Sequence, residues 1–99
     1  MDYQIQSTPT GLTVCLSGRL TFAENARFRS MLMQLQERAP SAVTLDLGEV
    51  EFIDSAGLGM LLYTRDTLHQ RQGVVSLSAA TGQVGRMLDL SRMRDLFGG

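Results

Sequence analysis

The segment from Asp54 to Gly59 carries the residue types that could do chemistry in this 99-residue chain. It reads Asp-Ser-Ala-Gly-Leu-Gly and lies between a short apolar run and a stretch with helical spacing. Carboxylate and hydroxyl oxygens at a helix entrance accept hydrogen bonds from the free backbone N–H groups of the first turn. The plain structural interpretation is therefore that Asp54 or Ser55 caps the following helix.

Two glycines in the same segment indicate more than a cap. Gly57 and Gly59 fall in the first turn and a half of the predicted helix. A glycine inside a helix costs roughly 0.5–1 kcal/mol relative to alanine, so two of them weaken the helix where it begins. We infer that something must come close to the helix at this point.

The spacing of the segment argues against three kinds of enzyme site. A nucleophile elbow, G-x-S-x-G, needs a glycine where the chain has Ile53. A catalytic triad needs a histidine beside Ser55, but His69, the only histidine, lies about 21 Å along the same predicted helix. A dinucleotide fingerprint needs a third glycine where the chain has Leu62. The chain also has no lysine for a Walker motif, so we expect no catalytic residue and no enzymatic activity.

The composition favours a small folded protein of the reducing cytoplasm, with one domain over residues 1–99. Lys+Arg total 9 and Asp+Glu total 10, a balance that lacks the basic surface typical of nucleic-acid binding. Cys15 and His69 are the only cysteine and histidine, so we expect no disulfide, no metal site and no cofactor. No apolar run approaches the ~18 residues of a membrane span, and we expect no membrane partner.

The apolar periodicity predicts an α/β domain with the order β-β-α-β-α-β-α. Thr21 and Glu24 have capping-box spacing and precede a helical pattern that ends at Pro40. The later strands should be parallel because helices separate them, which gives a mixed four- to five-stranded sheet covered by about three helices. The predicted elements are strands near 3–5 and 12–16, a helix up to 39, a strand at 42–47, a loop at 48–54, a helix at 55–72, a strand at 74–78 and a helix at 81–91.

The helix that follows Asp54 has two apolar stripes. One is sufficient to bury against the sheet and consists of Leu58, Leu61, Leu62 and Leu68. The neighbouring stripe begins beside Ser55 and consists of Ala56, Gly59, Met60 and Tyr63. Two interpretations of the second stripe remain open. Either an adjacent helix packs over it, or small residues and the two large side chains form a surface for a partner protein.

The residues from Val43 to Leu62, which include Phe-Ile-Asp-Ser-Ala-Gly-Leu-Gly, resemble the STAS domain of bacterial anti-sigma-factor antagonists. A weaker similarity extends from Tyr3 to Phe97. In that family the serine corresponding to Ser55 is phosphorylated by a serine kinase that is also the anti-sigma factor, and a metal-dependent PP2C-type serine phosphatase removes the phosphate. The unmodified form binds the partner and frees the sigma factor. The resemblance therefore implies a regulator of transcription that is switched at Ser55.

Physical chemistry supports such a switch at a helix entrance. A phosphoserine adds about −1.5 to −2 charge, which the free N–H groups and the dipole of the helix tolerate, so the surface changes sign while the fold survives. The expected function is thus an anti-sigma-factor antagonist whose unphosphorylated form binds its partner, with Ser55 as phosphoacceptor. The alternative is a STAS-like sensor or scaffold that binds a small ligand or nucleotide without phosphorylation. Asp54 either caps the helix or orients the Ser55 hydroxyl. The expected partner-binding residues are Asp54, Ala56, Gly57, Gly59, Met60, Tyr63 and Thr21.

Overall fold

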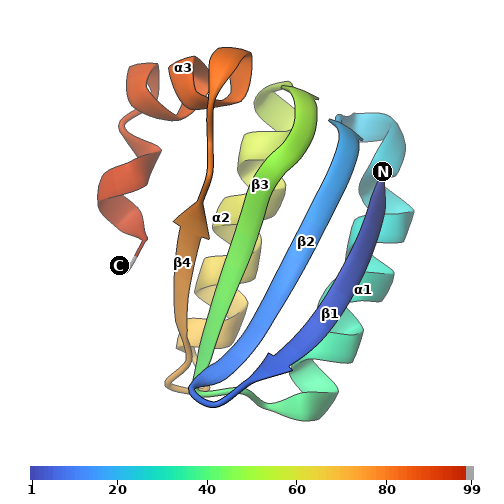
Figure 1. The fold of residues 1–99 in the computed structure, drawn as a ribbon, viewed down its shortest axis with the longest axis vertical. Helices are drawn as coiled ribbons and strands as arrows, with labels where there is room; N and C mark the ends of the chain where they lie inside the picture. The colour runs from blue at the N-terminus through green and yellow to red at the C-terminus, as the bar shows by residue number, and fades with distance from the viewer. Residues whose placement is uncertain (98–99) are drawn as a thin grey trace.

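The computed structural model describes residues 1–97 and confirms the predicted order of strands and helices (Figure 1). Two short 3-10 turns, η1 before the first helix and η2 after the last, complete the chain. The elements are β1 (Asp2–Thr8), β2 (Gly11–Leu20), η1 (Phe22–Glu24), α1 (Asn25–Arg38), β3 (Ala42–Ile53), α2 (Ser55–His69), β4 (Val74–Ser78), α3 (Gly82–Leu90) and η2 (Met93–Leu96). None of the helices in residues 1–97 is long and apolar enough to cross a membrane.

The sheet has four strands in the order β1-β2-β3-β4. The hairpin partners β1 and β2 are antiparallel, whereas β2, β3 and β4 are parallel to one another. The reason is connectivity, since a tight turn joins the first pair and a helix must carry the chain back between the later strands. The prediction of a mixed sheet with parallel later strands is therefore confirmed.

The hydrophobic core lies between the sheet and the two helices α1 and α2, which Figure 1 shows behind the strands. Alternate residues of β2 and β3 point into this core, as period-2 patterning requires. They pack against the predicted apolar face of α1. The buried residues of these elements are Leu12, Val14, Leu16, Leu20, Val43, Leu45, Leu47, Val50, Ile53, Phe28, Met31, Leu32 and Leu35. The intervening strand residues, such as Thr13, Cys15 and Asp46, form a polar front face.

One predicted boundary is wrong in a way that matters for the site. The segment predicted as a loop at 48–54 continues β3 as far as Ile53. Two register shifts in the β2–β3 ladder absorb the irregular pattern: Ser17 pairs with Glu49 after the first shift, and Leu20 pairs with Ile53 after the second. Such bulges break strict alternation, so the sequence pattern hides the strand. As a result Asp54 follows directly from the end of a paired strand.

The helix ends also differ from the predicted ones. The capping box at Thr21 is absent, because the Thr21 side chain makes no capping bond and the chain forms η1 before α1 begins at Asn25. The Glu24 carboxylate contacts the Met1 amino group instead, at 2.9 Å. At its other end α2 ends at His69 rather than near 72, and Gln72 adopts the left-handed conformation (φ 65°) that reverses the chain.

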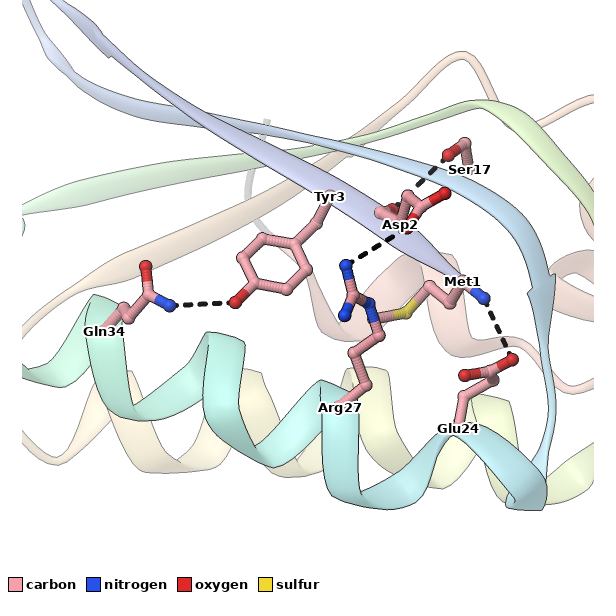
Figure 2. A network of polar contacts seen from close by, with 7 residues as sticks. All are labelled: Met1, Asp2, Tyr3, Ser17, Glu24, Arg27 and Gln34. Carbon is pink, nitrogen blue, oxygen red and sulfur yellow. Dashed lines mark hydrogen bonds and ion pairs between the residues drawn. The ribbon is translucent and has the colours of Figure 1, made fainter.

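Polar contacts fasten the edge strand β1 to α1 (Figure 2). The Arg27 guanidinium donates to the Asp2 carboxylate at 3.1 Å and lies 5.4 Å from the centre of the Tyr3 ring. The Tyr3 hydroxyl accepts a hydrogen bond from the Gln34 amide at 2.8 Å. Each exposed contact of this kind contributes little alone, but together they fix where α1 lies against the sheet.

Candidate functional site

Asp54 caps α2 and also joins it to the end of β2. One carboxylate oxygen accepts the Gly57 N–H at 2.7 Å, and the other accepts the Phe22 N–H at 3.3 Å. The Asp54 backbone N–H donates to the Leu20 carbonyl at 3.3 Å. The capping interpretation of Asp54 is therefore confirmed. Because both carboxylate oxygens hold backbone groups of the fold, Asp54 positions the start of α2 relative to η1.

Gly57 is required by the close approach of α2 to β2. A Cβ atom at this position would lie 2.2 Å from the Leu20 carbonyl oxygen and 2.6 Å from Cγ1 of Ile53. Those separations lie far inside van der Waals contact, so no side chain fits here. The neighbour inferred from the glycine pair is therefore, for Gly57, the chain's own β2 strand. Gly57 is buried, so its role is to allow α2 to pack closely against β2 rather than to contact a partner.

Ser55 stands at the first position of α2 and is exposed. Among the hydrogen bonds of residues 1–97, none involves its hydroxyl, whereas the side chain of the preceding Asp54 is fully engaged. The first N–H groups of a helix lack partners within it, and the helix dipole favours negative charge there. The geometry suits a hydroxyl that another protein can reach and modify without first opening the fold.

The sequence analysis missed Gln83, which supports the strand that leads to Asp54. Its side-chain oxygen accepts the Ile53 N–H at 2.9 Å, and its Nε2 donates to the Ile53 carbonyl at 2.8 Å. β4 ends at Ser78, so the amide of Gln83 takes the place of a neighbouring strand at this end of β3. A glutamine at the start of a helix carries no pattern that distinguishes this role from ordinary surface polarity.

The second apolar stripe of α2 is divided between core and surface. Gly59 is exposed and Tyr63 is 61% exposed, but Met60 is only 8% exposed and belongs to the core. The expectation that Met60 is a surface anchor is corrected here, because its side chain is almost wholly buried at the bottom of the space that it shares with Phe28 and Leu32 of α1. Ala56 is half-buried. The first stripe is buried as predicted at Leu58, Leu61 and Leu68, with Leu62 partly buried.

A groove with a volume of about 380 Å³ separates α1 and η1 from α2 on the side away from the sheet. A shallower hollow of about 200 Å³ continues it toward the C-terminal half of α1, and the two share Arg29, Leu32 and Tyr63. We refer to both together as the α1–α2 groove. It is lined by Phe22, Asn25, Phe28, Arg29, Leu32, Met33, Gln36, Ala56, Gly59, Met60 and Tyr63.

Other predicted residues lie near the groove without lining it. Thr21 is half-buried at the turn from β2 into η1, next to the exposed Phe22. Close by, the Arg19 guanidinium stacks on the Phe52 ring, 4.5 Å from its centre.

No group of three or more His, Cys, Asp or Glu side chains within residues 1–97 is placed to hold a metal ion. The described arrangement offers a reachable hydroxyl beside an apolar groove, which suits recognition by another protein.

A family model of the STAS domain matches residues 2–98. The chain belongs to the STAS domain family. Among related proteins, a STAS-domain-containing protein of Pseudomonas aeruginosa is 30% identical over 86 residues, 87% of this chain and 84% of that protein. An anti-sigma F factor antagonist of Paenibacillus polymyxa is 31% identical over 81 residues, 81% of this chain and 69% of that protein.

Two solved structures have the same fold. An anti-sigma factor antagonist from Mycobacterium paratuberculosis gives a TM-score of 0.86 at 22% identity and covers 97% of this chain and 81% of that chain. The Bacillus cell fate determinant SpoIIAA in its phosphorylated form gives 0.73 at 17% identity and covers 98% of this STAS domain and 89% of that chain. At these identities the likeness concerns the fold alone.

Proposed function

We propose that this STAS domain is an anti-sigma factor antagonist whose unphosphorylated form binds an anti-sigma factor that is also a serine kinase. The observation that carries the proposal is the exposed, unbonded hydroxyl of Ser55 at the start of α2, directly after the fully engaged Asp54. The name of the Paenibacillus relative, an anti-sigma F factor antagonist, supports the regulatory class. The existence of SpoIIAA in a phosphorylated form supports a switch of this kind on the same fold.

The switch acts through charge at the mouth of the α1–α2 groove. A phosphate on Ser55 adds about −1.5 to −2 charge beside the carboxylate of Asp54. The surface at the start of α2, which carries only the Asp54 charge when it binds the partner, therefore becomes strongly negative. Within the domain, the dipole of α2 offsets part of the repulsion between the phosphate and the Asp54 carboxylate, so the fold is retained. The kinase partner adds the phosphate, a PP2C-type serine phosphatase removes it, and binding follows the state of Ser55 rather than the stability of the domain.

A nucleotide-binding function fits the groove less well. Its volume lies within the range of small-molecule sites, but its lining carries one charged side chain, Arg29, and no glycine-rich phosphate loop. Apolar lining with exposed aromatic side chains is more typical of a protein interface. We therefore place protein binding first and regard a bound small ligand as the alternative.

The test compares Ser55→Ala and Ser55→Asp with wild type for binding to the partner that co-purifies from the protein's own cells. Ser55→Ala should bind the partner whatever the kinase does, and Ser55→Asp should bind about tenfold more weakly or worse. Thr81→Asp, which places the same charge at the start of α3, is the matched control and should bind like wild type. Mass spectrometry of wild-type protein should find phosphate on Ser55. Equal binding of all the variants would refute the proposal.

A further inference from the structure

The α1–α2 groove has the shape of a seat for a helix. Its α1 side is lined at Asn25, Arg29, Leu32 and Gln36, a spacing of three to four residues that follows one face of the helix. Its α2 side repeats the same spacing from Ala56 to Tyr63. From residue 25 to residue 36 the groove extends about 16 Å, which matches about three turns of a bound helix. Ridges spaced in this way accept the ridges of a third helix.

The side chains along the groove supply anchors that the domain itself does not cover. Phe22 is 73% exposed, and Met33 and Tyr63 are each 61% exposed. Large apolar side chains exposed together on a small domain mark an interaction surface rather than ordinary surface residues. Gly59 lies among them, and a Cβ atom at this position would meet nothing within 4 Å. Unlike Gly57, this glycine is not required by the fold, and it leaves room for a partner to approach.

One charge decides the chemistry of the occupant. Arg29 is the only charged residue that lines the groove, and it takes part in none of the ion pairs or hydrogen bonds of residues 1–97. Within that range, Arg38, Arg86 and Arg92 are exposed and unpaired as well, but none of them lines the groove, so Arg29 alone brings a free charge to it. An apolar groove with a single free guanidinium is complementary to an apolar surface that carries a carboxylate.

We propose that the α1–α2 groove binds an amphipathic helix of the anti-sigma factor, with an Asp or Glu of that helix paired to Arg29. The inference rests on the proposed function and adds to it the part of the partner that is recognised. It also explains why phosphorylation releases the partner. Ala56 lines the groove and is the neighbour of Ser55 in the chain. A phosphate on Ser55 therefore repels an acidic helix that the unmodified groove attracts.

The experiment measures the affinity of the co-purified partner for groove variants by calorimetry. Arg29→Glu should weaken binding at least about tenfold, Arg29→Gln should weaken it less, and Arg86→Glu, an exposed charge reversal on α3, should leave it unchanged. Gly59→Trp adds a large side chain to the groove at a position where a Cβ atom meets nothing within 4 Å, so it should weaken binding similarly while the melting temperature of the free domain stays within a few degrees. A photo-crosslinking amino acid at position 63 should attach to a helix of the partner that carries an acidic residue.

The outcomes separate this inference from the proposed function. If Arg29→Glu and Gly59→Trp bind like wild type while Ser55→Asp does not, the groove is not the seat and the phosphorylation switch stands. A crosslink to a strand or loop of the partner refutes the helix. Self-association that Gly59→Trp abolishes identifies a second copy as the occupant and overturns the inference. Failure of every variant and of wild type to bind the partner refutes both proposals.

Discussion

Gly57→Ala and Gly59→Ala add the same methyl group two residues apart on α2, and they should change stability in opposite directions. At Gly57 the new Cβ atom would lie 2.2 Å from the Leu20 carbonyl oxygen. Ordinary carbon–oxygen contacts are about 3.3 Å or longer, so the start of α2 must move away from β2 by about 1 Å. At Gly59 the methyl group enters open space and only improves helix propensity.

The displacement at Gly57 affects more than one contact. Forcing an atom into a packed region costs about 1–3 kcal/mol. The shift also weakens the hydrogen bonds that Asp54 makes with Leu20 and Phe22, at about 1 kcal/mol each. The gain in helix propensity offsets about 1 kcal/mol. Gly57→Ala should therefore lower the free energy of unfolding by about 2–4 kcal/mol, whereas Gly59→Ala should raise it by about 0.5–1 kcal/mol.

Urea unfolding followed by circular dichroism measures both changes. For a domain of this size each kcal/mol shifts the melting temperature by about 4–8 °C, so the melting temperatures of the two variants should differ by about 10–40 °C. The reasoning is refuted if Gly57→Ala is as stable as wild type, because the helix and strand would then not approach as closely in solution. It is also refuted if Gly59→Ala destabilises the isolated domain, because some part of the chain would then cover Gly59.

Three further pairs of substitutions test how the site is built, each by urea unfolding. Asp54→Ala removes the cap of α2 and the acceptor for the Phe22 N–H, and it should cost about 1–3 kcal/mol, whereas Asp54→Asn should restore only part of the loss, because its amide oxygen can accept one of the two N–H groups and its amide nitrogen cannot accept the other. Gln83→Ala should cost about 1–3 kcal/mol, and Gln83→Glu should not restore it, because a carboxylate cannot donate to the Ile53 carbonyl. Met60→Asp buries a charge and should lower the free energy of unfolding by more than about 3 kcal/mol. Tyr63→Asp replaces an exposed side chain and should change it by less than about 0.5 kcal/mol. Equal effects would contradict the assignment of Met60 to the core and of Tyr63 to the surface.

The sequence alone determined the order of the elements and the cap at the start of α2. Apolar periodicity separates strands from helices, and the connecting helices impose parallel pairing on β2, β3 and β4. The residue types at the start of α2 indicate a cap, and Asp54 forms it. These features depend on the chain within a few residues of each position, so they can be read from one sequence.

Only the tertiary structure decided how segments distant in sequence meet. The C-terminal half of β3 is a strand because residues 49–53 pair with β2 across two bulges. No local sequence pattern signals this pairing. Gly57 is required because the Leu20 carbonyl, more than 30 residues earlier in the chain, leaves no room for a side chain. The end of β3 at Ile53 is hydrogen-bonded by Gln83, about 30 residues later. Met60 belongs to the core and Gly59 remains on the surface, although the two are neighbours on α2. Periodicity tells which residues share a helix face, but the neighbouring element decides how far around that face the core extends.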